Sequence, residues 1–262
     1  MQVFFNILGF KIPSYGILIV TGVILANVLA IVYIRKTKKH DINDFIILEA
    51  YAVLGGFLGA KILYLIVSYK SIEWSRLFEI EYFNALMQGG FVFYGGLIGG
   101  IACVLLGGKI HNIKSMEYMR DFIGFIPFIH SFGRVGCFMS GCCYGIPYLG
   151  IGAVKFPADS YAPSDIELFP VQLVEACLLM IIAGIILYLV LVKNNTHGIN
   201  MYLILYGCTR FILEFLRYDD ARGGLLGLST SQWISLLIIA GVVLYTRITA
   251  IKNINKEAEH VL

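Results

Sequence analysis

Seven apolar stretches, each about as long as a bilayer is thick, divide this sequence of 262 residues. A helix that crosses the hydrocarbon core needs about 20 mainly apolar residues. Apolar residues make up 58% of the chain and charged residues 14%, whereas soluble domains have roughly 45–50% and about 25%. The stretches cover residues 14–34, 44–68, 91–107, 121–138, 171–192, 199–217 and 231–250. We expect an all-α polytopic membrane protein with about seven transmembrane helices, built as a single membrane domain over residues 1–262.

The distribution of Lys and Arg predicts the orientation, because positive residues collect on the cytoplasmic side. With an external N-terminus, eleven of them lie in inner segments, five in outer segments and four within or at the ends of spans. The inner group is Arg35, Lys36, Lys38, Lys39, Lys109, Lys114, Arg120, Lys193, Arg247, Lys252 and Lys256; the outer group is Lys11, Lys70, Arg76, Lys155 and Arg222. We expect the N-terminus outside, the C-terminus inside, and the long connections 69–90 and 139–170 outside.

Charge, cysteine usage and the N-terminus exclude several other classes. A net charge of +3, from 20 Lys and Arg against 17 Asp and Glu, is too small and scattered for a nucleic-acid interface. Three of the six cysteines lie in apolar runs and only Cys137, Cys142 and Cys143 cluster, which argues against a disulfide-stapled secreted module. The first apolar run is followed by a basic segment at 35–39, so we expect a retained span rather than a cleaved signal.

Two arginines fall inside expected spans, where an arginine costs about 2.5–3.5 kcal/mol on insertion scales. Arg134 lies 13 residues beyond Asp121 and Arg210 lies 11 beyond Ile199, which places both roughly 16–20 Å from the cytoplasmic face. At this common depth they are candidates to bind one anion together. The alternative is that each pairs with a carboxylate such as Glu175 or Glu214, or extends toward the interface.

Arg210, Glu214 and Arg217 are spaced i, i+4 and i+7, which predicts one helical stripe. In this arrangement Glu214 neutralises and orients the two arginines. For Arg217, at the end of a span, extension toward the interface is the simpler interpretation.

His130, Arg134 and Cys137 have the same spacing in the fourth stretch, which predicts an imidazole, a cation and a thiol on one helix face. The alternative for His130 is a core histidine with a satisfied hydrogen bond. The fourth stretch also contains Pro127, which is unusual in a lipid-facing helix.

Aromatic hydroxyls and glycines complete the candidate residues. Tyr15 and Tyr94 stand at the outer starts of the first and third stretches, where membrane proteins often carry interfacial tyrosines. Gly95 and Gly96 in the third stretch permit close approach of a ligand or of another helix, and glycine-rich membrane helices are often only packing surfaces.

Six motifs occur in order along nearly the whole chain. They are Ser14-Tyr15-Gly16, Gly59-Ala60-Lys61, residues 89–99 (GGFVFYGGLIG), Gly133 to Phe138 with Gly141 to Gly145, residues 169–175 (FPVQLVE) and residues 210–217 (RFILEFLR). Together these motifs resemble those of the bacterial prolipoprotein diacylglyceryl transferases, a family of seven-span membrane enzymes.

The resemblance implies transfer of a diacylglyceryl group from phosphatidylglycerol to the thiol of a lipobox cysteine in a secreted prolipoprotein. It implies a multi-pass protein of the bacterial cytoplasmic membrane, among membrane lipids, with its active site toward the extracytoplasmic side and without a cofactor. Arg134 and Arg210 would hold the phosphate and act in catalysis. The substrate-binding set would also contain Tyr15, Tyr94, Gly95, Gly96, Gln172, Glu214 and Arg217.

The chain departs from the family pattern at two places, which indicates a divergent branch. Cys137 and Cys142 stand where the family usually has asparagine and glutamate, and Tyr94 stands where it usually has histidine, often proposed as the base. A tyrosine with an ordinary pKa of ~10 is a poor base at neutral pH. We therefore nominate His130 as the base, with Tyr94 orienting a substrate; the rival hypothesis makes Cys137 or Cys142 a covalent nucleophile.

Other functions remain open at this point. Cys137, Cys142 and Cys143 would suit a thiol-redox protein, although no second outer pair exists to relay electrons. With His130 they are suitable soft metal ligands, but they lack the usual paired spacing, so we expect no metal. A transporter or a lipid-binding protein would also have buried arginines, and so would a lipid transferase with another acceptor; the order of the motifs argues for the family reaction.

Overall fold

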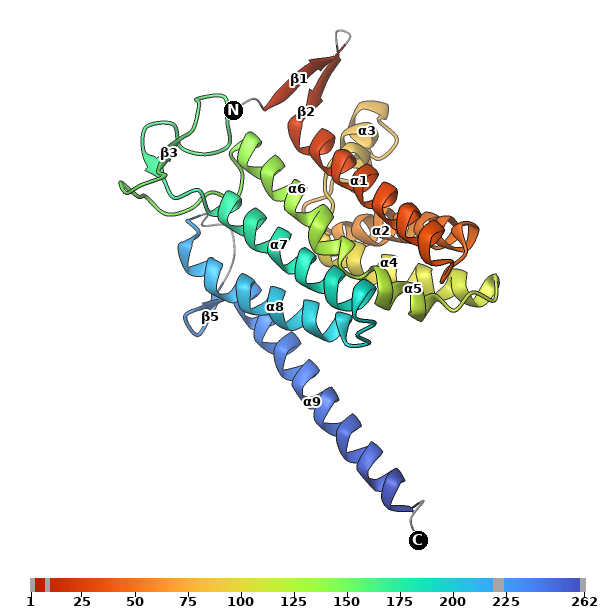
Figure 1. Cartoon of the computed structure of the whole chain (residues 1–262). Helices are drawn as coiled ribbons and strands as arrows, with labels where there is room; N and C mark the ends of the chain where they lie inside the picture. Colours follow the sequence, from red (N-terminus) through yellow and green to blue (C-terminus); the bar gives the residue numbers. More distant parts are fainter. Residues whose placement is uncertain (1–2, 8–9, 219–223, 260–262) are drawn as a thin grey trace. The chain divides into compact units, whose positions relative to one another are not determined.

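The computed structural model describes residues 3–7, 10–218 and 224–259, so Arg222 lies outside the described residues. The described residues form nine α-helices (Figure 1): α1 Ser14–Thr37, α2 Ile42–Val67, α3 Ile80–Gln88, α4 Phe93–Ile110, α5 Ser115–Phe122, α6 Phe125–Ser140, α7 Val171–Leu187, α8 Gly198–Leu213 and α9 Thr230–Glu259. They belong to two compact units. The first unit is the chain up to Ala30 and from Arg120 onward, and the second is Ile31–Met119.

The helices follow the predicted apolar stretches. Five are long and apolar enough to cross a membrane: α1, α2, α7 with the π-helical turn Tyr188–Val192, α8 with the 3₁₀ turn Glu214–Leu216, and α9. The consecutive helices α5 and α6 form a sixth candidate, bent by 51°, and the shorter apolar helix α4 corresponds to the remaining stretch. The prediction of an all-α polytopic membrane protein is confirmed, while seven crossings and their orientation remain predictions.

The bend between α5 and α6 has a local cause. Gly124 is the N-cap of α6, and Pro127 stands in the first helical turn, where its missing N–H is tolerated. A Cβ on Gly124 would lie 2.7 Å from Cγ of Leu187, so the glycine also permits close packing on α7. The proline that looked unusual in the fourth stretch therefore marks a break in the helix.

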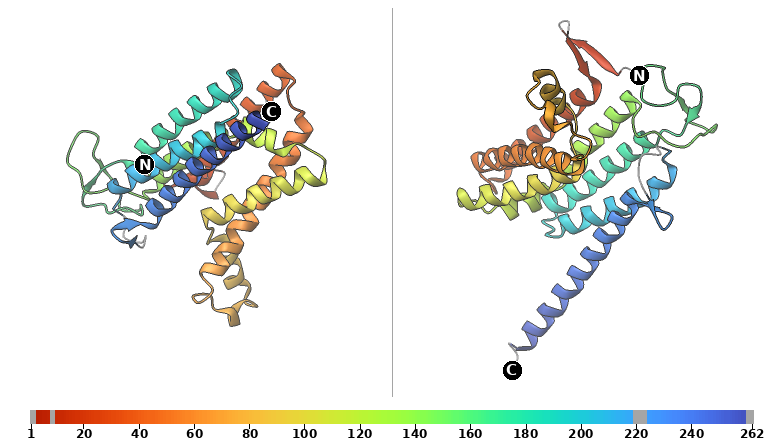
Figure 2. Two further views of the ribbon diagram at one scale, coloured as in Figure 1. Left: turned by 90° about the horizontal axis from the view of Figure 1, so that it is seen from below. Right: turned by 180° about the vertical axis from the view of Figure 1, so that it is seen from behind.

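In the first unit, α6 packs along α7, α7 along α8, and α8 along α9 (Figures 1 and 2). One buried cluster packs the C-terminal end of α7 and the first turns of α8 against the segment just before α6. It consists of Ile123, Ile182, Ile186, Val190 and Tyr202, each no more than 8% exposed. This packing holds α6 against α7 and α7 against α8, the three helices that carry His130, Arg134, Cys137, Gln172 and Arg210.

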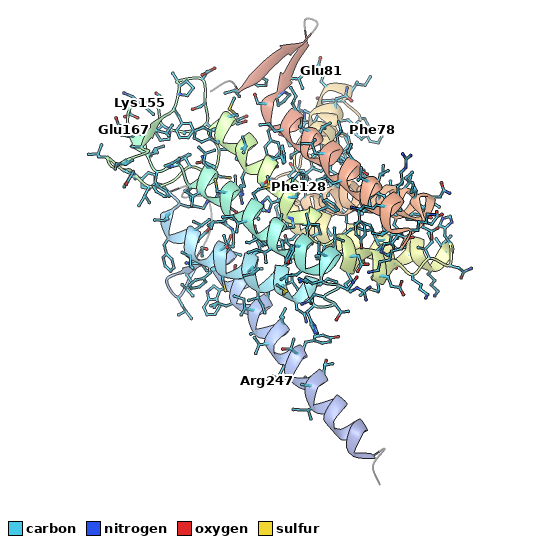
Figure 3. The ribbon with its side chains drawn as sticks, in the orientation of Figure 1. Phe78, Glu81, Phe128, Lys155, Glu167 and Arg247 are labelled. Atoms are coloured by element: carbon cyan, nitrogen blue, oxygen red, sulfur yellow. The ribbon has the colours of Figure 1, made fainter. Side chains whose placement is uncertain are left out.

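The loop between α6 and α7 has its own small core. Strand β3 (Val154–Lys155) pairs antiparallel with β4 (Glu167–Leu168), so that Lys155 stands opposite Glu167 (Figure 3). Phe156, Ala162 and Leu168, the last of which belongs to β4, form a buried cluster in this loop. Two further antiparallel pairs, β1 (Phe4–Ile7) with β2 (Phe10–Pro13) and β5 (Gly224–Leu225) with β6 (Leu228–Ser229), precede α1 and α9.

In the second unit, α2 and α4 are in contact through glycines on both helices. A Cβ on Gly55 or Gly59 would collide with the backbone of α4, and a Cβ on Gly95 or Gly99 would collide with the backbone of α2. The two backbones therefore meet directly, as in other small-residue interfaces between membrane helices. The loop before α4 carries α3 and a 3₁₀ turn, Trp74–Arg76.

Candidate functional site

The first arginine, Arg134, lies in the middle of α6 and faces α7. Its Nη2 is 2.9 Å from Oε1 of Glu175, and the two side chains are 12% and 1% exposed. The distance is that of an ion pair, although its angle does not make a hydrogen bond, since Oε1 has no hydrogen-bond partner among the described residues. This pairing with Glu175 is the simpler alternative that the sequence left open.

The second arginine, Arg210, lies in the last turn of α8. Its Nη2 is 2.7 Å from Oε2 of Glu214, four residues later, and also donates a hydrogen bond of 3.2 Å to Oγ of Ser231 at the start of α9. The predicted role of Glu214 as the counter-ion of Arg210 agrees with this geometry. Each arginine therefore has a carboxylate that offsets the cost of burying its charge.

Pairing with a carboxylate does not use all the donors of either arginine. Nε of Arg134 and Nη1 of Arg210 are buried and have no hydrogen-bond partner among the described residues, and the same holds for the acceptor Oε1 of Gln172. Buried polar atoms are normally hydrogen-bonded, and leaving one unpaired costs about 1–3 kcal/mol. Two free guanidinium donors are what a site for a phosphate-bearing ligand provides.

Tyr206 on α8 lies near both arginines and was not among the residues predicted from the sequence. Its side chain is hydrogen-bonded to Arg134 and lies within electrostatic range of both Arg210 and Glu175. The available signal was its position on α8, one turn before Arg210 on the same face. The contact to Arg134 comes from another helix, so helical periodicity alone could not show it.

His130 lies on the same face of α6 as Arg134, as its spacing predicts, because α6 is a regular helix there. The imidazole packs edge-on against Tyr206, with ring centroids 5.4 Å apart. Arg134 and Arg210 are the charged groups that act on it.

The C-terminal turn of α6 explains how the three cysteines meet. Gly141 adopts the left-handed conformation, with φ of 75°, and its N–H caps the helix on the carbonyls of Cys137 and Phe138. The next N–H, that of Cys142, donates to the carbonyl of Cys137 at 3.1 Å. A left-handed residue after a helix turns the chain back over its last turn, which carries Cys142 and Cys143 to Cys137.

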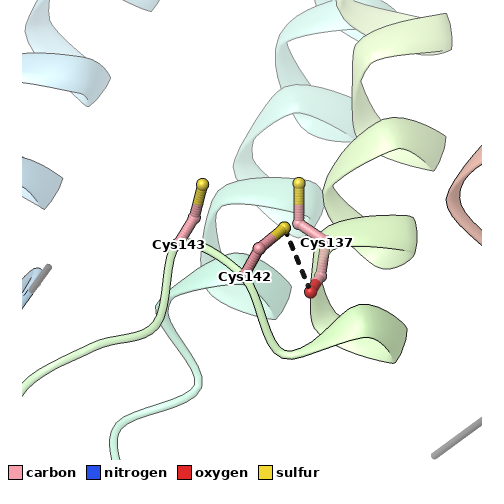
Figure 4. A group of neighbouring side chains, drawn as sticks. All are labelled: Cys137, Cys142 and Cys143. Atoms are coloured by element: carbon pink, nitrogen blue, oxygen red, sulfur yellow. Dashed lines mark hydrogen bonds between the residues drawn. The ribbon is translucent and has the colours of Figure 1, made fainter. Parts of the chain in front are cut away.

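The three sulfur atoms of Cys137, Cys142 and Cys143 all lie within 4.8 Å of one another (Figure 4). The thiol of Cys142 donates a long hydrogen bond of 3.7 Å to the carbonyl of Cys137. All three are free cysteines, Cys137 buried and the others half-buried. The neighbouring thiols of Cys137 and Cys142, together with the nearby guanidinium of Arg217, hold the pKa of the Cys143 thiol below its ordinary value. Cys143 was not among the predicted site residues.

Arg217 does not continue the helical stripe of Arg210 and Glu214, so that prediction is wrong. Helix α8 ends at Leu213, and after one 3₁₀ turn Arg217 is extended, with φ of −102° and ψ of 145°. It forms an antiparallel bridge with Gly145. The bridge brings its side chain to Cys143, to which it is hydrogen-bonded. Arg217 therefore faces the thiols rather than only the membrane interface.

Tyr15 and Gln172 border the same group of thiols. Tyr15, in the first turn of α1, lies in electrostatic range of Arg134 and all three clustered cysteines. Gly136 on α6 allows this close approach of Tyr15, because a Cβ at that position would stand only 2.9 Å from the Cα of Tyr15. Nε2 of Gln172, in the first turn of α7, donates to the backbone carbonyl of Cys142 at 2.9 Å. The structure thus joins nine of the twelve predicted site residues in one unit.

The other three predicted site residues, Tyr94, Gly95 and Gly96, lie at the start of α4 in the second unit. Gly95 packs against the backbone of α2, which is the packing role that the sequence left as an alternative. Lys61 on α2 donates to the carbonyl of Gly89 at 2.7 Å and so holds the segment that leads to Tyr94.

Comparison with known proteins gives a consistent result over almost the full length. A family model described as prolipoprotein diacylglyceryl transferase matches residues 2–247. A phosphatidylglycerol–prolipoprotein diacylglyceryl transferase of Clostridium tetani is 37% identical over 248 residues, which cover 93% of this chain and 96% of the relative. A protein of Clostridium perfringens named phosphatidylglycerol–prolipoprotein diacylglyceryl transferase 2 is 33% identical over 258 residues, 97% of each chain. The chain therefore belongs to the prolipoprotein diacylglyceryl transferase family.

Proposed function

We propose that this protein transfers the diacylglyceryl group of phosphatidylglycerol to the lipobox cysteine of a prolipoprotein. The sulfur of the acceptor forms a thioether with the glyceryl carbon, the carbon–oxygen bond to the phosphate breaks, and glycerol phosphate leaves. Family membership supports this reaction, since the relatives in Clostridium tetani and Clostridium perfringens are named for both substrates.

The observation that carries the proposal is the pair of buried arginines with unused donors. Nε of Arg134 and Nη1 of Arg210 have no hydrogen-bond partner among the described residues and could bind a phosphodiester, and Tyr206 lies in electrostatic range of both guanidinium groups. The leaving phosphate gains negative charge as the carbon–oxygen bond breaks. Donors that are already oriented in a water-poor site stabilise that charge more in the transition state than in the ground state.

The remaining residues have supporting roles in this proposal. Glu214 holds Arg210 in position, and Gln172 holds the loop that carries Cys142. Tyr15 and Arg217 border the place where a thiol acceptor would approach the phosphate. From the sequence, Tyr94, Gly95 and Gly96 of the second unit remain proposed substrate-binding residues, Tyr94 through its hydroxyl and the glycines by allowing close approach.

In the hypothesis drawn from the sequence, His130 is the base that deprotonates the acceptor. The covalent alternative, in which Cys137 or Cys142 first takes the lipid, is chemically less favourable. It would form the same stable thioether that the product contains, and a second thiolate would have to break that carbon–sulfur bond. A trapped lipid adduct on the wild-type enzyme would nevertheless support it.

We further propose that both units act as one transferase domain in the cytoplasmic membrane of a bacterium. The N-terminus lies outside, the C-terminus inside, and the active site faces the extracytoplasmic side. The distribution of Lys and Arg supports this topology. A cysteine introduced at Asn194, between α7 and α8, should react with an impermeant thiol reagent only after the inner face is exposed; reaction in intact cells would contradict the orientation.

The reaction is tested with the purified protein in vesicles that contain phosphatidylglycerol and a lipobox peptide. Mass spectrometry should detect a peptide that has gained one diacylglyceryl group, and no gain when phosphatidylethanolamine replaces phosphatidylglycerol. An oxidised peptide thiol would indicate a redox protein instead. An unchanged peptide, in vesicles where a known relative is active, would indicate a transporter or another acceptor.

A further inference from the structure

We propose that Cys137, Cys142 and Cys143 bind one zinc ion, and that the fourth position of this zinc takes the thiolate of the acceptor cysteine. The inference rests on the proposed function, because it names the group that prepares the acceptor for transfer. It assigns a role to the thiol cluster. In this role the zinc supplies the acceptor as a thiolate, which is the task often proposed for the histidine that the family usually has at the position of Tyr94.

The distances between the sulfur atoms fit a tris-thiolate site. Three sulfurs bound to a tetrahedral zinc by bonds of about 2.3 Å lie about 3.8 Å from one another. The three sulfur atoms here all lie within 4.8 Å of one another, so each pair has to come closer by at most about 1 Å. Small changes in side-chain torsion close this gap. Figure 4 shows the three side chains extending toward one side of the turn that ends α6.

The backbone holds the ligands in place by itself. The left-handed residue Gly141 sets the turn, and a Cβ there would lie 2.7 Å from Cβ of Ser160, so the position has no room for a side chain. Cys143 also has a positive φ, of 58°, which is uncommon for a residue with a side chain and shows that the surrounding contacts determine the turn. Gln172 fixes the carbonyl of Cys142. Because these contacts already order the three ligands, little conformational entropy is lost when the metal binds.

The charges around the cluster suit an anionic metal complex. A zinc ion with three thiolates carries one negative charge, and a fourth thiolate adds another. The guanidinium groups of Arg134 and Arg217 both lie in electrostatic range of the thiols, Arg217 as a hydrogen-bond partner of Cys143. Two cations beside the site therefore balance the charge that a tetrathiolate complex would accumulate.

Three ligands leave a position open, which is the pattern of catalytic rather than structural zinc. In the described part of the chain, this group contains the three cysteines and no histidine or carboxylate. Cys142 and Cys143 are half-buried, so an incoming peptide can reach the cluster. The adjacent arginine site, through Arg134, would hold the lipid phosphate next to the bound acceptor.

The step balances without a further reactant. The acceptor thiol binds zinc and releases its proton to water, because a thiol that coordinates zinc is deprotonated. A lone pair of the bound thiolate attacks the glyceryl carbon, and the bond from that carbon to the phosphate oxygen breaks, with the electron pair leaving on glycerol phosphate. The resulting thioether is a neutral, weaker ligand, so it dissociates and the open position returns.

The spacing of the cysteines in the sequence argued against a metal, because it contains no pair of the usual type. The structure changes that assessment, since the cap at Gly141 brings residues five and six positions after Cys137 back to it. His130 is not part of the cluster, and this route requires no base from it.

Metal content provides the first test, and the chain supplies its own control. The full-length protein in detergent is loaded with zinc, passed over a chelating resin and analysed by mass spectrometry of the element. We expect about one zinc per chain in the wild type and in the variant Cys103→Ser, Cys177→Ser, Cys208→Ser, and none in Cys142→Ser or Cys143→Ser. Equal zinc in the cluster variants, or none in the wild type, would overturn the site.

Cobalt substitution tests the open position without relying on any variant. Cobalt bound by three thiolates gives intense visible and near-ultraviolet bands, and a fourth thiolate changes them. A lipobox peptide should change the spectrum of the wild-type cobalt protein, whereas the same peptide with serine in place of cysteine should not. An identical response to both peptides would show that the metal does not bind the acceptor.

Transfer assays then separate this inference from the proposed function. Removal of zinc should lower transfer to the lipobox peptide at least about 100-fold, and zinc should restore it. Full transfer by protein that lacks zinc would refute the zinc mechanism while leaving the proposed function intact. A zinc site that responds to the peptide in a protein that transfers nothing from phosphatidylglycerol would refute the proposed function while leaving the zinc site intact. A disulfide within the cluster of the freshly isolated active enzyme would also overturn the proposal.

Discussion

The centre of the first unit and the α2–α4 contact of the second unit use opposite means to join helices. Between α6 and α7, the buried charges of Arg134 and Glu175 meet at 2.9 Å, while Arg210 beside them pairs with Glu214 within its own segment, and both arginines leave guanidinium donors free. Between α2 and α4, glycines let two backbones meet with no side chain between them. Both regions are rich in motifs of the family, yet only the first contains unpaired polar groups among its described residues.

This difference shows why the family motifs indicate a ligand site in the first region and only helix packing in the second. An ion pair inside a membrane protein is costly, so one that also leaves donors unused indicates a ligand. A glycine contact stabilises by van der Waals packing and needs no ligand to explain it. Substitutions in the first region should therefore change the reaction, and those in the second should change stability.

Arg134→Lys should have the largest effect. Lysine keeps the charge but cannot present the planar donors that bind a phosphate from two nitrogens. We expect transfer to the lipobox peptide to fall about 100-fold or more with unchanged thermal unfolding. The control is Arg76→Lys, an exposed arginine paired with Glu79 on the loop before α3, which should keep the wild-type rate. Near-normal turnover of Arg134→Lys would contradict the phosphate site.

Gly99→Ala should mainly affect stability. The added methyl would collide with the backbone of α2, so we expect a loss of about 2–3 kcal/mol, seen as a lower unfolding temperature in detergent. The matched control is Gly184→Ala on α7, where nothing lies within 4 Å and the better helix propensity of alanine should be neutral or slightly stabilising. The rate per folded molecule should stay unchanged in both; a selective loss of rate in Gly99→Ala would give α4 a catalytic role.

Tyr206→Phe should have a smaller effect on the reaction. It removes only the hydroxyl that is hydrogen-bonded to Arg134, and we expect about a 10-fold loss of transfer, consistent with one charge-assisted hydrogen bond. Tyr202→Phe is the control, since Tyr202 is equally aromatic, is buried and stacks on Tyr206 with centroids 5.8 Å apart. Equal losses in the two variants would indicate a packing effect.

His130→Gln should have the smallest effect if zinc prepares the acceptor. We expect a loss of less than about 5-fold and an unchanged pH profile, because no proton would pass through the imidazole. A large loss with a shifted profile would instead identify His130 as the base, as the sequence analysis nominated. The rate is measured from pH 5 to 9 at saturating phosphatidylglycerol.

Much of the helical architecture and part of the site could be read from the sequence. Apolar length predicted the helices because a membrane requires it, and the cost of buried charge singled out Arg134 and Arg210. Helical spacing placed His130 correctly on the face of Arg134, since α6 is regular at that point. These successes depend on interactions that are local or that the bilayer imposes.

The remaining features depend on contacts between segments. Arg217 leaves the helix because residues after Leu213 pair with the loop before α7, and no periodicity reveals such a bridge. Tyr206 belongs to the site because of its contact with Arg134 on α6. Cys143 belongs to it because of a left-handed turn at Gly141, and a glycine in the sequence permits such a turn without predicting it. Spacing alone therefore underestimated the thiol cluster.

The two ion pairs also differ in when they can form during synthesis. Arg210 finds Glu214 one turn later, so α8 enters the bilayer with its charge already compensated. Arg134 has its partner Glu175 on the following helix, so the charge on α6 is compensated only after α7 has been synthesised. An uncompensated arginine costs about 2.5–3.5 kcal/mol at insertion, enough to make an isolated α6 reluctant to stay in the membrane. Helices α6 and α7 should therefore enter the membrane together, as a hairpin held by the Arg134–Glu175 ion pair.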